Sequence, residues 1–202
     1  MPQDLRLCCV GDSFTAGAGD ETALGWVGRL SAAAWREGVP CTAYNLGVSG
    51  DTSADIRRRA EAEILARFLG SEADLQAVVF CFGANDTGLI DGLPQVDAAH
   101  TLDNARELLG WAAARWRVLM LGSPPLPHDP AHDARLAALS AAMEPLCAEL
   151  AVPFLPLHAP LSASAAWRAG ALRNDGIHPD GAGYAAMAAL VERWPPWRTL
   201  LA

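Results

Sequence analysis

The chain has 202 residues, of which 51% are hydrophobic, with a formal net charge of -8 and a sequence pI of about 5.0. This acidic balance argues against nucleic acid or an anionic membrane surface as the main partner. All 15 basic residues are arginine, and the missing lysine amine excludes a Walker-type phosphate loop, a Schiff-base enzyme and a protein kinase.

The first predicted strand covers residues 5–10 and ends in a glycine-bearing turn that carries a serine. The apolar run LRLCCV is followed directly by Gly11, Asp12 and Ser13. A short apolar run bounded by glycine is typical of a strand buried on both faces. Considered alone, Ser13 favours a turn or a helix cap over a nucleophile.

Helices and strands alternate along the rest of the chain. Apolar stripes at helical spacing predict helices over residues 23–37, 52–69 and 132–150, and further helices are expected over 96–114, 162–169 and 181–193. Apolar runs predict further strands over 41–46, 76–82, 117–121 and 152–157. This alternation predicts one α/β domain, residues 1–202, with a parallel sheet covered by helices on both faces.

Three local features of these elements carry predictions of their own. Thr52 or Ser53 caps the helix over 52–69, and the three consecutive arginines at 57–59 are expected on a solvated face rather than at an anion site. Pro145 is expected to kink its helix. The strand over 152–157 contains prolines, which favour the edge of the sheet.

Polar, glycine-bearing loops follow four of the predicted strands, after residues 10, 46, 82 and 121. In an open parallel sheet, ligands bind outside the carboxyl ends of the strands. The loop that contains Asp175 and His178 precedes the last helix and can reach the same edge. We therefore expect the chemistry of this protein at that edge of the sheet.

The side chains at this edge supply each group that a serine nucleophile needs to cleave an ester. Ser13 can attack, His178 can take its proton, and Asp175, three residues earlier, can orient the imidazole. The backbone amides of Ser13 and Gly47 and the side-chain amide of Asn85 can donate to an oxyanion. Each block has an ordinary alternative as a turn or helix start. Independent turns, however, have no reason to supply all four parts at strand ends.

Four blocks resemble, in order, those of the GDSL-type lipases and esterases, also called SGNH hydrolases: GDSF at 11–14, NLG at 45–47, GAND at 83–86 and DGIHP at 175–179. The resemblance implies a three-layer α/β/α, flavodoxin-like fold with a five-stranded parallel sheet. It also implies a Ser–His–Asp triad and no metal or other cofactor. The four namesake residues would be Ser13, Gly47, Asn85 and His178. Phe14 stands where Leu is usual, and Ala84 stands in place of a second Gly.

The expected function is hydrolysis of a small-molecule carboxylic ester or thioester through an acyl-serine intermediate. An acyltransferase using the same site, or a non-catalytic α/β module that binds a small ligand, remains an alternative. Leu89, Ile90 and Leu93 can line an acyl groove or equally fold inward. The sequence predicts neither the acyl chain length, nor the alcohol or thiol moiety, nor the oligomeric state.

One other cluster has residue types that bind metals. It consists of His128, Asp129, His132 and Asp133, but Pro130 between the histidines disfavours a regular helical pair of ligands. A loop at the rim of the active site is the expected role for this segment.

The five cysteines are odd in number and show no C-x-x-C spacing, which favours free thiols in a reducing compartment. Neither a signal peptide nor a membrane span is visible in the sequence. The expected location is cytoplasmic, with export left open.

Overall fold

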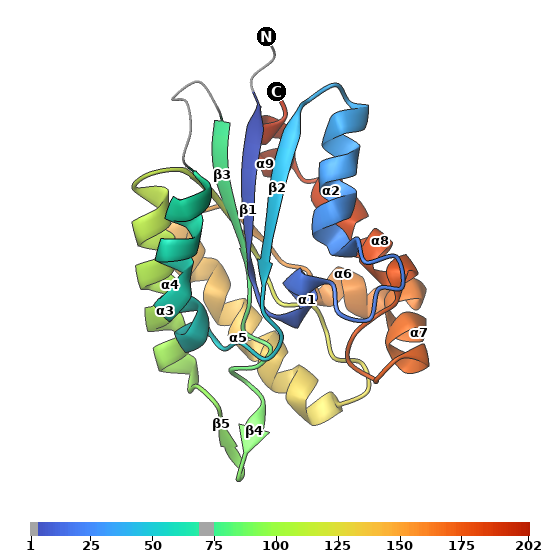
Figure 1. Ribbon diagram of the computed structural model, residues 1–202. Coiled ribbons are helices and arrows are strands. Elements are labelled where there is room, and N and C mark those ends of the chain that lie inside the picture. The colour runs from blue at the N-terminus through green and yellow to red at the C-terminus, as the bar shows by residue number, and fades with distance from the viewer. Residues whose placement is uncertain (1–3, 69–74) are drawn as a thin grey trace.

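A computed structural model describes residues 4–68 and 75–202 of the chain. A parallel sheet in the order β2-β1-β3-β6-β7 runs through its centre, with helices on both faces (Figure 1). The five strands are β1 (Leu5–Gly11), β2 (Cys41–Gly47), β3 (Leu75–Cys81), β6 (Arg117–Leu121) and β7 (Phe154–Leu155). The three-layer α/β fold expected from the sequence is thereby confirmed, including the edge position of the last strand.

Helices of the described residues alternate with the strands as expected, and the short helices over 13–16 and 195–200 were not predicted. In chain order, the helices of this part of the chain are α1 (Ser13–Ala16), α2 (Gly25–Arg36), α3 (Ser53–Arg67), α4 (Ala98–Ala113), α5 (Pro130–Glu149), α6 (His158–Ala163), α7 (Ala165–Arg173), α8 (Gly181–Glu192) and α9 (Pro195–Leu200). A short antiparallel hairpin, β4 (Leu89–Ile90) and β5 (Leu93–Pro94), projects from the lower end of the molecule in Figure 1. No helix in the described part of the chain is both long and apolar enough to cross a membrane.

The two faces of β1 explain why its sequence is apolar without interruption. Leu7 and Cys9 pack into the core cluster that contains residues of α2, α7 and α8, while Cys8 and Val10 pack into a second cluster with residues of α3, α4 and α5. Successive side chains of a strand point to opposite faces. A strand covered on both sides therefore needs apolar residues at every position.

The boundaries of two predicted helices can be compared with those observed. The predicted helix over 162–169 is wrong, because α6 and α7 are separate helices that meet at Ser164. The backbone of Ser164 is extended, and its hydroxyl accepts a hydrogen bond from the Trp167 amide at 3.3 Å, so it ends one helix and caps the next. At α3, where Thr52 or Ser53 was the predicted cap, the cap is Thr52, which forms a capping box with Asp55. That helix ends at Arg67, and the predicted end at Leu69 lies outside the described residues.

The arginines at 57–59 do not share one environment. Arg57 and Arg58 are exposed and pair with Glu107 and Asp55, as a solvated face requires. Arg59 departs from that prediction, since only 18% of its side chain is exposed. Helix α5 continues through Pro145, and the kink there stays a prediction.

All five cysteines are buried and free. Burial raises the pKa of the Cys8 and Cys147 thiols to about 12, which suppresses the reactive thiolate. These cysteines therefore act as small core side chains.

Candidate active site

Ser13 lies in a turn whose shape is fixed by the two residues before it. Gly11 ends β1 where a Cβ would approach the Cys81 carbonyl oxygen to 2.0 Å, so only glycine fits. Asp12 then caps α1, and its Oδ1 accepts a hydrogen bond from the Phe14 amide at 3.0 Å. Burial raises the pKa of the Asp12 carboxyl to about 7, although this hydrogen bond opposes the shift. Ser13 is consequently held at the start of a helix at the carboxyl edge of the sheet.

His178 connects Ser13 to Asp175. Its Nε2 lies 2.7 Å from Ser13 Oγ, and its Nδ1 lies 2.7 Å from Asp175 Oδ2. Burial favours a higher pKa for Asp175, but hydrogen bonds from the His178 ring and from the amides of His178 and Ile177 lower the pKa to about 2. Asp175 is therefore ionised at neutral pH and accepts the proton of Nδ1, which leaves Nε2 free to accept a proton from the serine.

The loop that carries His178 is anchored to the serine side of the molecule. Asn174 Nδ2 donates to the carbonyl oxygens of Gly19 at 3.0 Å and of His178 at 3.1 Å. Gly176 adopts a φ of +84°, a conformation that glycine tolerates without strain. The hydrogen bonds of the Asn174 side chain therefore hold the loop of His178 in place before any substrate arrives.

Phe14 contacts the imidazole directly. The centroids of the Phe14 and His178 rings are 5.2 Å apart at an interplanar angle of 52°, and Phe14 also packs on Trp167 at 5.9 Å. Phe14, which stands where Leu is usual in the family that the sequence resembles, thus packs against the imidazole of His178.

Asn85 lies in the loop after β3 with one hydrogen of its side-chain amide already bonded. Its Nδ2 donates to the carbonyl oxygen of Asp51 at 2.9 Å, which leaves the second hydrogen available to a ligand. The neighbouring Asp86 is buried and accepts from the Ser53 amide and the Thr101 hydroxyl, both at 2.9 Å. These contacts tie the loop to the starts of α3 and α4.

The prediction of Gly47 as an oxyanion donor does not agree with this geometry. Its amide donates to Asn45 Oδ1 at 3.0 Å, and a Cβ there would lie 2.1 Å from the Ala16 amide nitrogen. Gly47 therefore serves the close packing of β2 against α1 and has no free donor.

The next glycine of the same loop is a better candidate. Within residues 4–68 and 75–202, the amide of Gly50 donates no hydrogen bond, and neither does that of Ser13. Gly50 has a φ of +87° and precedes Asp51, the residue that Asn85 contacts. Gly47 and Gly50 lie three residues apart in the sequence. The Gly47 amide is bonded to the Asn45 side chain, whereas the Gly50 amide is free among the described residues.

The histidine and aspartate side chains at 128–133 do not converge on a common point. His132 Nε2 lies 2.9 Å from the Ala84 carbonyl, Asp129 caps α5, and Asp133 Oδ1 lies 2.9 Å from His158 Nε2. In the part of the chain that the structure describes, no group of three or more His, Cys, Asp or Glu side chains is arranged to hold a metal ion. The helix predicted from residue 132 begins at Pro130, so His128 and Asp129 precede it, and His132 holds the loop of Asn85.

Leu89, Ile90 and Leu93 do not fold inward. They are 47%, 61% and 71% exposed on the β4–β5 hairpin, which begins four residues after Asn85. The base of the hairpin is fixed by hydrogen bonds from the Gln95 amide to the Gly88 carbonyl at 2.9 Å and from Arg135 Nε to the Thr87 carbonyl at 2.9 Å. An exposed apolar surface thus follows the loop of Asn85 along the chain.

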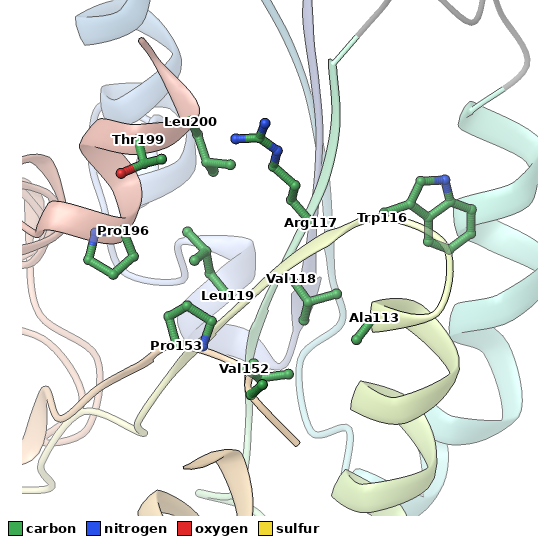
Figure 2. A pocket seen from close by; sticks show the side chains of 11 residues that line it. Ala113, Trp116, Arg117, Val118, Leu119, Val152, Pro153, Pro196, Thr199 and Leu200 are labelled. Carbon is green, nitrogen blue, oxygen red and sulfur yellow. The ribbon is translucent and has the colours of Figure 1, made fainter. Parts of the chain in front are cut away.

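A cavity of about 410 Å³ lies away from these residues. Figure 2 shows the side chains that line it. It is lined by the start of β6, the segment before β7 and helix α9, including Arg117, Pro153 and Leu200. The strands begin there, whereas Ser13 and Asn85 follow strand ends. This cavity therefore does not belong to the candidate active site.

Comparisons with known proteins show the family and the fold of the chain. A sequence model of the GDSL-like lipase/acylhydrolase family matches residues 9–186, a range that contains all four blocks. The esterase TesA of Pseudomonas aeruginosa is 30% identical over 198 residues, covering 96% of this chain and 89% of that protein. The lipase/acylhydrolase of Enterococcus faecalis superimposes with a TM-score of 0.78 at 25% identity, over 98% of this chain and 97% of that one. A catalytic mutant of the acetylxylan esterase Axe2 of Geobacillus stearothermophilus shares the fold, with a TM-score of 0.77 at 20% identity over 96% and 94% of the two chains.

Proposed function

Because the chain belongs to the GDSL-like lipase/acylhydrolase family and is an ester hydrolase, we propose that it cleaves small carboxylic esters or thioesters through an acyl-serine intermediate. The observation that carries this proposal is the continuous hydrogen-bonded path from Ser13 through His178 to Asp175, with both distances at 2.7 Å. Such a path is the arrangement by which a serine hydroxyl is activated.

In the first half of the reaction, Ser13 Oγ attacks the carbonyl carbon while His178 Nε2 takes the hydroxyl proton. Asp175 holds the imidazole in the required tautomer and stabilises its positive charge. When the tetrahedral intermediate collapses, His178 gives the proton to the departing alcohol or thiol. The acyl group then remains on Ser13.

In the second half, water replaces the alcohol or thiol. His178 takes a proton from the water as it attacks the acyl carbon, and returns that proton to Ser13 Oγ as the carboxylic acid leaves. The two halves use the same base in opposite directions, so no further proton carrier is needed.

The negative charge that develops on the carbonyl oxygen requires donors that are free in the resting protein. We assign this role to the amides of Ser13 and Gly50 and to the second hydrogen of Asn85 Nδ2. The support is that neither backbone amide has another acceptor among the described residues, and that Asn85 is held against Asp51. Preorganised donors of this kind are often the largest single contribution to catalysis.

Apolar acyl groups have a ready contact surface in the hairpin. Leu89, Ile90 and Leu93 are exposed beside the loop of Asn85, and burying them against an acyl chain would be favourable by roughly 25 cal/mol per Å² of apolar surface. We propose that this hairpin contacts the acyl moiety of the substrate.

Turnover of a small aryl ester by Ser13→Ala tests the proposal. Loss of the nucleophile is expected to lower kcat by about 10⁴-fold or more. Ser162→Ala is a matched control, because the Ser162 hydroxyl donates to the His158 carbonyl within α6 and takes no part in the proposed reaction. Ser13→Ala with wild-type kcat and an unchanged fold would refute the proposal.

A further inference from the structure

Arg59 makes contacts that its two neighbours in α3 do not make. Its Nη2 donates to the Gly11 carbonyl at 2.9 Å, and its Nε donates to Asp51 Oδ2 at 2.6 Å. Glu63, one turn further along the helix, accepts from Nη1 at 2.8 Å and completes the coordination of the guanidinium. Only 18% of the Arg59 side chain and 15% of the Asp51 side chain are exposed.

Two of these acceptors, Gly11 and Asp51, belong to the backbone segments that carry the proposed oxyanion donors Ser13 and Gly50. Gly11 is two residues before Ser13, and Asp51 directly follows Gly50. The Gly11 carbonyl also accepts the Val48 amide at 3.0 Å, so two hydrogen bonds hold the serine turn against the Gly50 loop at this one oxygen.

The third donor is attached to the same unit. Asn85 Nδ2 donates to the Asp51 carbonyl, and Arg59 holds the carboxylate of the same Asp51. Through Asp51 and Gly11, one guanidinium therefore connects the segments of Ser13, Gly50 and Asn85. A planar fork of donors is suited to bridging a carboxylate and a carbonyl in a fixed geometry.

We propose that Arg59 is a positioning residue for the oxyanion site, an inference that rests on the proposed function. It touches no reacting atom and keeps the three donors at the spacing that the tetrahedral intermediate requires. Its effect falls on the transition state, because the carbonyl oxygen gains charge and full hydrogen bonds only there.

The inference is tested by the kinetics of Arg59→Gln together with its affinity for a trifluoromethyl ketone, which forms a tetrahedral adduct with a serine nucleophile. A displacement of about 1 Å at such a site can cost about 10²-fold, so we expect kcat to fall by about 10- to 100-fold. KM is expected to stay within about threefold of wild type, and affinity for the ketone to fall by the same factor as kcat/KM. Arg59→Lys, which restores a cation near Asp51, is expected to recover part of kcat.

Arg57→Gln is the matched control, since Arg57 lies two residues earlier in the same helix and pairs with the exposed Glu107. It is expected to behave as wild type. If Arg59→Gln does not fold, Asp51→Asn serves as the second variant. It keeps the shape of the side chain, removes the charge that Arg59 contacts and is expected to show the same loss of kcat and ketone affinity.

The outcomes separate this inference from the proposed function. Wild-type kcat and ketone affinity in a folded Arg59→Gln or Asp51→Asn protein, with Ser13→Ala inactive, would overturn the role of Arg59 alone. A change confined to KM or to thermal stability would overturn it as well, because a purely structural contact predicts that pattern. Full activity of Ser13→Ala in the same assay would instead refute the proposed function.

Discussion

Asn85 divides the two hydrogens of its side-chain amide between a structural and a proposed catalytic partner. One is bonded to the Asp51 carbonyl at 2.9 Å in the free protein, so the orientation of the amide is fixed before substrate binds. Fixed donors stabilise a developing charge without reorganising during the reaction. The proposed role of Asn85 therefore depends on a contact that no substrate has to induce.

Asn85→Ala is expected to lower kcat by about 10²- to 10³-fold, with a much smaller change in KM, because the lost hydrogen bond is strongest in the transition state. Steady-state kinetics with an aryl ester measures both parameters. Asn104→Ala provides the comparison, since Asn104 donates to the Ser53 hydroxyl at the start of α3 and not to the proposed reaction centre. An equal loss in both variants would contradict a specific role for Asn85.

Asp20 illustrates a buried charge that stabilises the fold. Its side chain is fully buried, pairs with Arg29, and accepts hydrogen bonds from the Thr22 hydroxyl at 2.7 Å and the Gly25 amide at 2.8 Å. Burial favours a higher pKa, but these partners lower the pKa of Asp20 to about 2. Because the folded pKa lies below the unfolded value of about 3.9, the stabilisation is complete above about pH 4 and is lost as the pH falls towards 2.

Asp20→Asn is accordingly expected to lower the free energy of unfolding by about 2 kcal/mol at pH 7. The difference from wild type is expected to shrink as the pH falls from about 4 to about 2. Urea unfolding of both proteins across this range measures it. A difference that does not vary with pH would show that the charge of Asp20 is not responsible.

Single residues were predictable from the sequence where their chemistry is distinctive. Ser13, His178 and Asp175 were chosen by residue type and position, and His178 lies within hydrogen-bond distance of both others. Gly47 was predicted as an oxyanion donor, but the sequence does not show that the Asn45 side chain accepts from the Gly47 amide, because the Asn45 side chain is itself held by a hydrogen bond to the Thr15 carbonyl in another element. The catalytic roles of Ser13, His178 and Asp175 are proposals.

At the scale of elements, the end of β2 is packed against α1 without space for a methyl group. A Cβ on Gly47 would lie 2.1 Å from the Ala16 amide nitrogen, and α1 carries Ser13 at its first position. Any side chain at Gly47 must therefore displace α1 and Ser13 as well as the strand.

Gly47→Ala is expected to destabilise the protein by about 1–3 kcal/mol, as is typical of overpacking, and to lower kcat in the fraction that folds. Gly110→Ala is the matched control. Gly110 lies within α4 with no heavy atom near its Cβ position, so that change is expected to raise stability by up to about 1 kcal/mol. Thermal unfolding and ester turnover of both variants check this, and a wild-type Gly47→Ala protein would contradict the packing argument.

The β4–β5 hairpin provides a test of substrate contact. Replacing its three exposed leucine and isoleucine side chains, Leu89, Ile90 and Leu93, with serine removes no core packing, so the free energy of unfolding is expected to change by less than about 0.5 kcal/mol per site. Turnover of octanoyl aryl esters is expected to fall at least about tenfold more than turnover of acetyl esters. Equal effects on both esters across a chain-length series would show that the hairpin does not contact the acyl group.

Other elements show where sequence patterns are insufficient. The sequence over 162–169 does not reveal that Ser164 interrupts the helix, because a serine can lie inside a helix or cap one. Arg59 cannot be distinguished from Arg57 and Arg58 by sequence, since its burial follows from the position of Gly11 in another element.

At the scale of the whole molecule, the parallel sheet assembles the site from distant parts of the chain. Ser13 and His178 are 165 residues apart, and the loop of Asn85 follows a third element at the same edge. Because parallel strands end on one side, loops far apart in sequence meet there. This topology was predictable from alternating strands and helices, while the single domain over 1–202 stays a prediction.

The central claim is that catalysis proceeds through an acyl group on Ser13, and mass spectrometry of the rapidly acid-quenched enzyme during turnover of an aryl ester tests it most directly. We predict a single acyl adduct whose mass equals that of the acyl group of the ester. It should map to the peptide containing Ser13 and be absent from Ser13→Ala. An adduct on another residue, or undiminished turnover by Ser13→Ala, would contradict the account.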